Sequence, residues 1–284
     1  MDRGAEERAS SLVNVISGFS KSNLALPNLP REITKNPDST NCSLFFHDGN
    51  LMVFGSTDKK PSKCFQLENL TWKEHSTLNR KRVNSATVTT DKGTFVFGGV
   101  HNGKSYEYLP NGSKKWKIGK SSLLQLHDRF FNGCAIKVKS KQKIWLINGY
   151  RTLDFDINTH TSKELPFRLI RKRYSFACAY IPGTNNILIT GGIYDYEPQS
   201  SCEILNTESS AVTMASSMNC ARSSHGMGIV NINGEERLTV FGGRKEYGGV
   251  HDSVELYNSQ TQEWEWACHL RLNIPRTDFG FVNI

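Results

Sequence analysis

Histidine and cysteine are the side chains here best suited to metal binding and nucleophilic chemistry, and neither forms a clustered motif. The eight histidines are scattered singly, without the short spacing that zinc enzymes use. The seven cysteines are widely spaced and include no Cys-x-x-Cys pair. We therefore expect buried free thiols in a reducing compartment. The pattern predicts no metal and no other cofactor.

Other catalytic signatures are also missing from the sequence. There is no Gly-x-Ser-x-Gly elbow for a serine nucleophile and no phosphate-binding loop. The remaining ionisable candidates are arginines that recur at regular positions. The role of these arginines depends on the strands and turns in which they lie.

Composition indicates a globular protein with many strands. The 284 residues include 37% hydrophobic and 22% charged residues, which provides enough apolar material for a core. Aromatic residues reach 10%, and aromatic side chains favour strands. The N-terminus lacks a secretory signal pattern, and no stretch approaches the roughly 20 apolar residues needed to cross a bilayer. We expect a cytoplasmic protein with no membrane partner.

A degenerate repeat runs along the chain. Alternating, aromatic-rich segments end in Asn at fairly even intervals of 41, 42, 47, 48 and 52 residues. Such segments are typical of strands, and Asn favours the turn that follows. The repeated asparagines are Asn28, Asn69, Asn111, Asn158, Asn206 and Asn258.

Two further marks lie upstream, the first before each of these asparagines and the second before four of them. The first is a glycine or a pair of glycines after a β-rich run, as at Gly98-Gly99. The second, further upstream, is an Arg followed four residues later by a small residue, as at Arg82 and Ala86. A Trp often follows the Asn, as at Trp264. The order of the marks predicts four strands per repeat.

This order of Arg, Gly-Gly, a Tyr-like strand and Trp resembles the kelch repeat, from about residue 11 to residue 284. The resemblance implies an all-β, six-bladed β-propeller with four antiparallel strands per blade. The ends of the chain carry complementary parts of one repeat, so we expect the C-terminal strand to join the N-terminal strands and close the ring.

The expected organisation is one kelch propeller over 11–284 after a flexible N-terminal tail, 1–10. Blade 1 combines 11–36 with 275–284. The other expected blades are blade 2 (37–78), blade 3 (79–126), blade 4 (127–171), blade 5 (172–220) and blade 6 (221–274).

In kelch propellers the first strand of each blade lines a central channel, and the segments entering it surround the channel mouth. The resemblance therefore places the residues after each repeated Arg at this mouth. Two interpretations of the arginines stay open, because they could contact a partner or bond loop carbonyls between blades. The candidate partner-binding residues are Arg82, Asn84, Arg129, Phe131, Arg173, Ser175, Arg222, Ser224, His225, Arg276 and Asp278.

Charge is distributed unevenly along the chain. The net charge is +8, but residues 79–173 hold 20 basic and 6 acidic residues, a net of +14, whereas the remainder has a net of −6. A basic sector of one sign attracts acidic partners. We therefore expect a partner with an acidic segment, although the sector could also be a merely solvated surface. Nucleic acid is disfavoured, because no nucleic-acid-binding motif accompanies the charge.

Together these features predict a non-catalytic protein–protein interaction module with a scaffold or substrate-recognition role. The family resemblance suggests actin or ubiquitin-ligase components as partners. It leaves open whether the chain is a fragment of a BTB-kelch protein or stands alone. The alternative is a small sugar-isomerising or other kelch-propeller enzyme, with Arg222, Arg276 and Asp278 acting in the channel.

Overall fold

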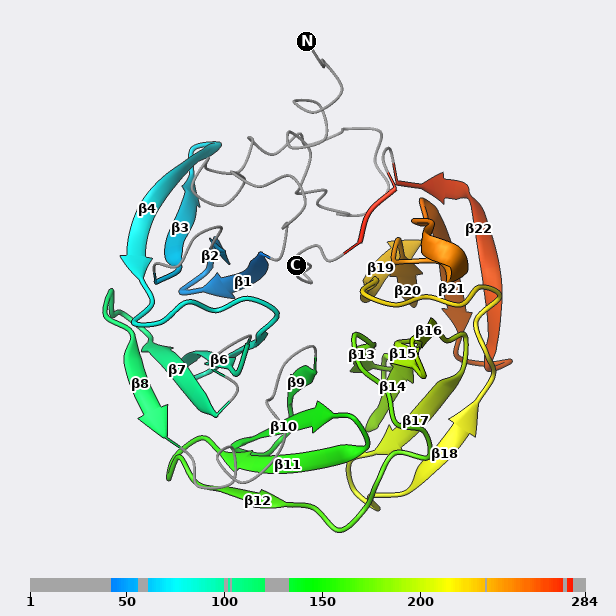
Figure 1. Cartoon of the computed structure of the whole chain (residues 1–284), viewed down its shortest axis with the longest axis horizontal. Helices are drawn as coiled ribbons and strands as arrows, with labels where there is room; N and C mark the ends of the chain where they lie inside the picture. Colours follow the sequence, from blue (N-terminus) through cyan, green and yellow to red (C-terminus); the bar gives the residue numbers. More distant parts are fainter. Residues whose placement is uncertain are drawn as a thin grey trace.

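The computed structural model describes most of the chain outside its two ends. The described residues are 42–55, 61–99, 102, 104–120, 133–232, 234–272 and 275–277. They form five four-stranded antiparallel sheets, arranged around a common centre (Figure 1), and one two-stranded hairpin. The protein is therefore an all-β propeller. The expected first blade and N-terminal tail lie outside the described residues, except for 275–277.

Each four-stranded sheet carries the number of the expected blade whose residue range contains it, so the numbering starts at blade 2. Blade 2 contains β1 (Ser43–His47), β2 (Asn50–Gly55), β3 (Lys63–Glu68) and β4 (Thr71–Thr77). Blade 3 contains β5 (Ala86–Thr90), β6 (Gly93–Phe97), β7 (Ser105–Pro110) and β8 (Lys117–Lys120). Blade 4 contains β9 (Cys134–Lys137), β10 (Lys143–Asn148), β11 (Arg151–Asp156) and β12 (Ser162–Glu164).

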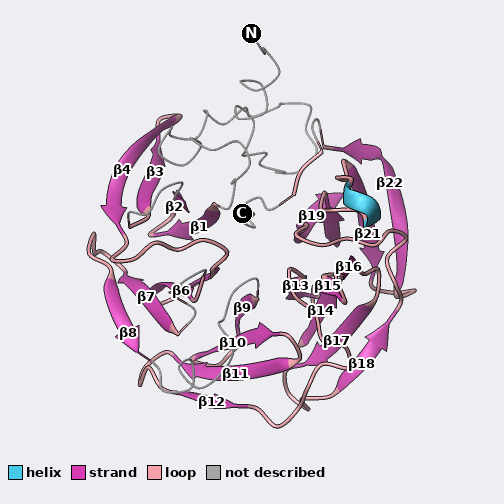
Figure 2. Ribbon diagram, in the orientation of Figure 1, coloured by secondary structure: helices cyan, strands magenta, loops and turns pink. Residues whose placement is uncertain are grey.

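Blade 5 contains β13 (Ala177–Tyr180), β14 (Asn186–Thr190), β17 (Cys202–Asn206) and β18 (Val212–Ala215). A hairpin of β15 (Ile193–Tyr194) and β16 (Glu197–Pro198) lies between β14 and β17 in the chain. Blade 6 contains β19 (Gly226–Ile232), β20 (Glu235–Phe241), β21 (Ser253–Asn258) and β22 (Glu263–Arg271). A 3-10 turn, Glu246–Gly248, precedes β21 (Figure 2).

Position within a blade explains the hydrophobic pattern of each strand. The first strands contact one another from blade to blade and lie toward the centre of the ring (Figure 1). Second strands such as β6 and β14 are almost wholly buried, because neighbouring blades cover both faces of the sheet. In fourth strands such as β4, at the rim of the ring, most side chains are exposed or half-buried. The core therefore consists of apolar layers between successive blades.

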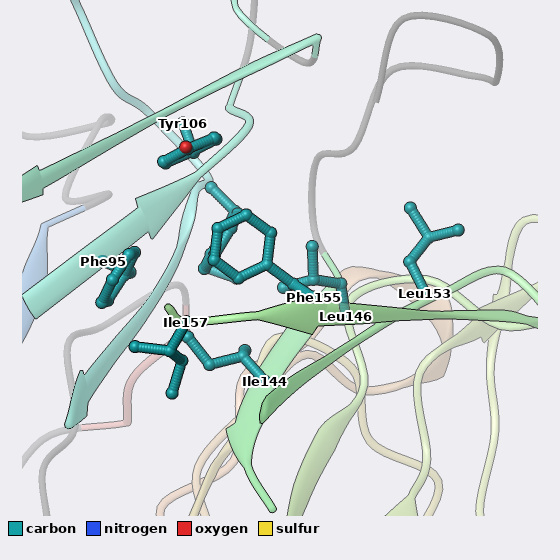
Figure 3. Close-up of a cluster of buried hydrophobic side chains, with 9 residues drawn as sticks. Phe95, Tyr106, Ile144, Leu146, Leu153, Phe155 and Ile157 are labelled. Atoms are coloured by element: carbon teal, nitrogen blue, oxygen red, sulfur yellow. The ribbon is translucent and has the colours of Figure 1, made fainter. Parts of the chain in front are cut away.

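The layer between blades 3 and 4 shows this packing (Figure 3). Phe95 and Tyr106 of blade 3 pack against Ile144 and Phe155 of blade 4, all essentially inaccessible to water. The rings of Tyr106 and Phe155 lie 5.0 Å apart in an edge-to-face arrangement. The Tyr106 hydroxyl is also 2.9 Å from Nδ1 of His160.

Five of the repeated asparagines lie at the end of a third strand or in the turn after it, and Asn28 lies outside the described residues. Asn206 Oδ1 accepts hydrogen bonds from the backbone N–H groups of Glu208 and Ser209, and Asn258 does the same one blade later. In blade 4 the Asp156 carboxylate takes this role in place of the predicted Asn158. The two residues are interchangeable here because both carry a short side-chain acceptor.

The cysteines differ from expectation. Cys134 and Cys178 form a disulfide that joins β9 to β13, the first strands of blades 4 and 5. Cys64, Cys202, Cys220 and Cys268 are free thiols, and the first two are buried. The prediction of seven free thiols was wrong because the ring brings together residues 44 positions apart. The inference of a reducing compartment therefore loses its premise.

The last described residues continue the repeat beyond blade 6. The Gly243 N–H donates to the Arg276 carbonyl at 2.6 Å, just as the Gly192 N–H donates to the Arg222 carbonyl at 2.8 Å. Arg276 therefore meets blade 6 as Arg222 meets blade 5. No helix in the described part of the chain has the length and apolar character to cross a membrane.

Candidate functional site

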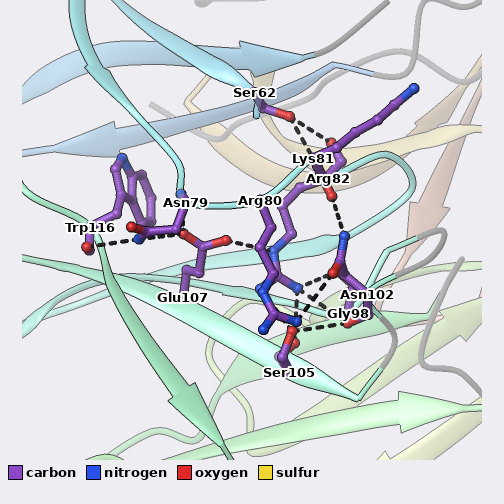
Figure 4. A network of polar contacts seen from close by, with 10 residues as sticks. All are labelled: Ser62, Asn79, Arg80, Lys81, Arg82, Gly98, Asn102, Ser105, Glu107 and Trp116. Carbon is purple, nitrogen blue, oxygen red and sulfur yellow. Dashed lines mark hydrogen bonds and ion pairs between the residues drawn. The ribbon is translucent and has the colours of Figure 1, made fainter. Parts of the chain in front are cut away.

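The repeated arginines are anchors inside the blades. Arg82 is fully buried, and its guanidinium donates to the carbonyls of Gly98 at 2.6 Å and Ser105 at 2.9 Å (Figure 4). Its Nε donates to Oε1 of Glu107 at 3.1 Å. Burial lowers the pKa of Arg82, while the Glu107 carboxylate opposes that shift. The side chain thereby ties the Gly-Gly segment to the third strand.

The same network recurs in blades 5 and 6. Arg173 donates to the Gly191 carbonyl at 2.7 Å and to Glu203 at 2.6 Å. Arg222 donates to the Gly242 carbonyl at 2.8 Å and to Glu255 at 2.9 Å. All four of these charged side chains are buried. Three blades thus use one arrangement of arginine, glycine carbonyl and glutamate.

Each glutamate has a second task, which is to hold the segment that enters its blade. The second oxygen of Glu107 accepts from the Asn79 backbone N–H at 2.6 Å (Figure 4). Glu203 accepts from Ile170, and Glu255 from Asn219, each at 2.7 Å. The sequence reasoning missed these glutamates. Their signal was a lone acidic residue inside an apolar third strand, as in the segment Val254-Glu255-Leu256.

The second glycine of each pair allows the entering segment to approach closely. Gly192 has a φ of +96°, and a Cβ there would lie 2.7 Å from the Tyr174 carbonyl oxygen. Gly243 repeats this geometry, with a Cβ that would lie 2.9 Å from the Ser223 carbonyl oxygen. The paired glycines are therefore required by backbone packing.

These contacts correct part of the predicted partner-binding set. Arg82, Arg173 and Arg222 are at most 1% exposed, so a partner on the surface cannot reach their guanidinium groups. Their guanidinium groups do bond loop carbonyls, but within one blade rather than between neighbouring blades as the sequence suggested. Arg129 lies outside the described residues, and Arg276 is half-buried.

His225 is also inaccessible, contrary to its predicted contact role. Its Nε2 lies 2.8 Å from the Thr190 hydroxyl, and the ring packs beside Gly191 and Gly243. Burial lowers the pKa of His225 to about 3, and Arg222 adds to this shift. The imidazole is therefore a neutral packing group between blades 5 and 6.

Three predicted residues do lie in a partly accessible position. Asn84, Ser175 and Ser224 each stand two residues after a buried arginine and are half-buried. All three adopt left-handed backbone conformations, with φ of 55°, 53° and 51°. The Ser224 N–H donates to the Ser175 carbonyl at 2.7 Å, which links adjacent blades. The other two predicted mouth residues, Phe131 and Asp278, lie outside the described residues.

The loops at the same end of the blades carry exposed aromatic side chains that the sequence reasoning missed. Antiparallel order places the loops between second and third strands beside the segments that enter each blade. Tyr150 is 41% exposed, Tyr194 54%, Tyr196 95% and Tyr247 98%. Tyr196 and Tyr247 also have positive φ, which is strained for a bulky residue. Aromatic residues at predicted turns were the available signal.

The basic sector divides between the two ends of the blades. Arg171 and Lys172 are exposed in the segment entering blade 5. Lys139 and Lys141 lie in the β9–β10 turn at the opposite end. There the Lys139 ammonium donates to the Thr184 carbonyl at 2.7 Å and lies 4.4 Å from the centre of the Tyr180 ring. The charge therefore does not form one continuous surface.

The enzyme alternative requires Arg222, Arg276 and Asp278 to act on a substrate in the channel. Arg222 is held by Glu255 and two backbone carbonyls, so it has no accessible guanidinium to offer a substrate. Asp278 lies outside the described residues. Within the described ranges, no three His, Cys, Asp or Glu side chains converge as metal ligands.

Comparison with known proteins gives no independent assignment. No model of a known protein family matches the chain, and no curated protein sequence is significantly similar to it. The repeats and the geometry of the blades are therefore the observations that bear on its role.

Proposed function

We propose that the chain is a six-bladed kelch-type propeller that serves as a non-catalytic scaffold for binding another protein. The family proposal is supported by three copies of one network, in which an arginine bonds the first glycine of a Gly-Gly pair. The backbone of Arg276 supports a sixth unit, because it begins a further repeat against blade 6. Residues 11–36 and 275–284 would complete that unit.

The observation that carries the binding function is the exposed tyrosines on loops at one end of the blades. A large aromatic side chain in water adds nothing to the core, whereas tyrosine is enriched at the centres of protein interfaces. Tyr196 and Tyr247 are almost fully exposed and have positive φ. An exposed aromatic residue in such a conformation supports a functional role.

The loops that carry these tyrosines are tied to one another rather than free. Isolated bridges connect Gly149 to Arg173, Tyr174 to Ile193 and Ser223 to Arg244. Prior ordering lowers the entropic cost of binding. Asn84, Ser175 and Ser224 form the inner margin of the same surface and offer polar contacts. Family resemblance makes actin and ubiquitin-ligase components the first partners to test, in the cytoplasm.

The experiment is a selection of protein fragments that bind the immobilised full chain, followed by calorimetry with each purified fragment. Tyr196→Ala and Tyr247→Ala should each weaken binding about thirtyfold, as expected for central interface residues. Leu70→Ala is the matched control, since Leu70 is 59% exposed, has a positive φ and lies in a turn at the opposite end.

The result that would overturn the proposal is equally specific. Fragments that bind tightly but tolerate both tyrosine variants and lose affinity with Leu70→Ala would place binding at the other end. Turnover of a sugar by the purified chain would favour the enzyme alternative.

A further inference from the structure

We propose that the partner contributes an acidic segment that docks on the seam between blades 4 and 5. The seam is defined by Tyr150, Ile170, Arg171, Lys172, Tyr174 and Tyr194. This inference rests on the proposed binding function and adds its location and the chemistry of its partner.

Backbone hydrogen bonds bring the three segments of the seam side by side. The Leu169 N–H donates to the Tyr150 carbonyl at 2.9 Å, and the Arg173 N–H to the Gly149 carbonyl at 3.0 Å. On the other side, Tyr174 and Ile193 exchange two hydrogen bonds, of 3.1 and 2.7 Å. The segment entering blade 5 is therefore flanked by the β10–β11 turn and by β15.

The seam has an apolar component that is open to solvent. Ile170 and Tyr194 are each 54% exposed, and Tyr150 is 41% exposed. Tyr174 is half-buried, and the Lys172 ammonium lies 5.4 Å from the centre of its ring. These exposed aliphatic and aromatic side chains favour a partner that contributes an apolar side chain to the contact.

The seam also has a fixed positive charge. Arg171 and Lys172 are both exposed, while the adjacent Arg173 is buried against Glu203. The same glutamate accepts from the Ile170 and Arg171 N–H groups at 2.7 and 3.1 Å. Glu203 thus holds the segment from beneath, where its charge is matched by Arg173. Both exposed side chains are cations, which attract carboxylates.

The chemistry favours an acidic peptide over nucleic acid. Two exposed cations provide little of the phosphate neutralisation that nucleic-acid binding requires. Acidic residues do occur nearby: Asp195 and Glu197 follow Tyr194 in the β15–β16 hairpin, and Glu164 pairs with Arg151 and Arg168. The fitting partner carries carboxylates around an apolar residue.

The probe is a fluorescein-labelled peptide, Glu-Glu-Glu-Leu-Leu-Glu-Glu-Glu, titrated with the full chain and followed by fluorescence anisotropy. Arg171→Glu combined with Lys172→Glu should weaken its binding at least about tenfold. Lys114→Glu with Lys115→Glu is the matched control, because this pair is also adjacent and exposed but lies in the β7–β8 turn. It should leave the affinity unchanged.

Two further measurements examine the apolar component and the class of ligand. Ile170→Ala and a peptide with Gly-Gly in place of Leu-Leu should each weaken binding, and circular dichroism should show that all variants remain folded. Binding should also weaken as salt rises. Three results would overturn the inference: no saturable binding below about 1 mM, equal losses in both charge-reversal pairs, or tighter binding of a twelve-residue oligothymidine.

The failure of this inference can be told apart from failure of the proposed function. Suppose that a selected fragment loses affinity with Tyr196→Ala and Tyr247→Ala but not with Arg171→Glu combined with Lys172→Glu. This result would exclude the seam as the docking site and would still support the scaffold role.

Discussion

Blades 3, 5 and 6 differ from blades 2 and 4 at one position of the third strand. In the first group a buried glutamate pairs across the sheet with the residue two before the first glycine, as Glu255 does with Val240. The equivalent residue is Phe65 in blade 2, opposite Val53, and Thr152 in blade 4, opposite Ile147. A four-stranded blade therefore forms with or without the glutamate.

The four strands of a blade therefore do not need the buried glutamate, whose role is to bind the segment that enters the blade. Phe65 of blade 2 packs with Leu44, Leu51 and Val53 in an apolar cluster. A well-packed apolar group can replace a buried ion pair without loss of stability, because the charges need no desolvation. The ion pairs matter where they exist, since removing one partner leaves the other charge buried alone.

The largest expected effect comes from breaking one ion pair. Glu255→Leu leaves Arg222 buried without its carboxylate, and should lower the free energy of unfolding by about 3–5 kcal/mol in urea denaturation. Combining it with Arg222→Met should restore part of that loss. Glu263→Leu, at an exposed position of β22, is the control. A loss below about 1 kcal/mol for Glu255→Leu would show that the pair is dispensable.

The second test concerns blade 4, which lacks the glutamate but is joined to blade 5 by the Cys134–Cys178 disulfide. Cys134→Ser with Cys178→Ser should lower the free energy of unfolding by about 2–4 kcal/mol, because a 44-residue separation is no longer constrained in the unfolded chain. The exposed Cys268, changed to Ser, is the control. An unchanged stability, or the absence of a disulfide in peptide mapping, would contradict the expectation.

The third test examines the contact between blades 5 and 6 through His225. Its pKa falls from an ordinary value of 6.5 to about 3 on folding, so between those values the unfolded chain binds a proton that the folded chain does not. Stability should therefore be lost as the pH falls. Between pH 7.5 and 5 this histidine should account for about 2 kcal/mol. His225→Gln should show a correspondingly flatter pH dependence, and parallel profiles would refute the account.

The smallest effect is expected at Thr152 of blade 4. Its side chain is fully buried, and its hydroxyl has no hydrogen-bond partner in the described part of the structure. Thr152→Val keeps the shape and removes an unsatisfied group, so it should raise the free energy of unfolding by about 1 kcal/mol. Thr190→Val is the contrasting variant, because that hydroxyl bonds His225. A stability loss with Thr152→Val would indicate a partner among the remaining residues.

Much of the architecture could be predicted because it is written in short-range patterns. Gly98-Gly99 and Gly242-Gly243 marked the ends of second strands, and Asn206 and Asn258 marked turns whose N–H groups they bond. Such marks act through their own backbone, so a sequence displays them directly. The Cys134–Cys178 pairing has no local mark, because it depends on how two blades meet.

The role of the arginines depended on the tertiary structure. Their spacing identified the repeat, but it could not say whether Arg82 points into the blade or toward a partner. That depends on Glu107, 25 positions away in sequence, and on the carbonyls of Gly98 and Ser105, which converge only when the sheet forms. The accessible surface is likewise decided by packing. Burial removed His225 from the candidate site, and loop geometry brought Tyr196 and Tyr247 into it.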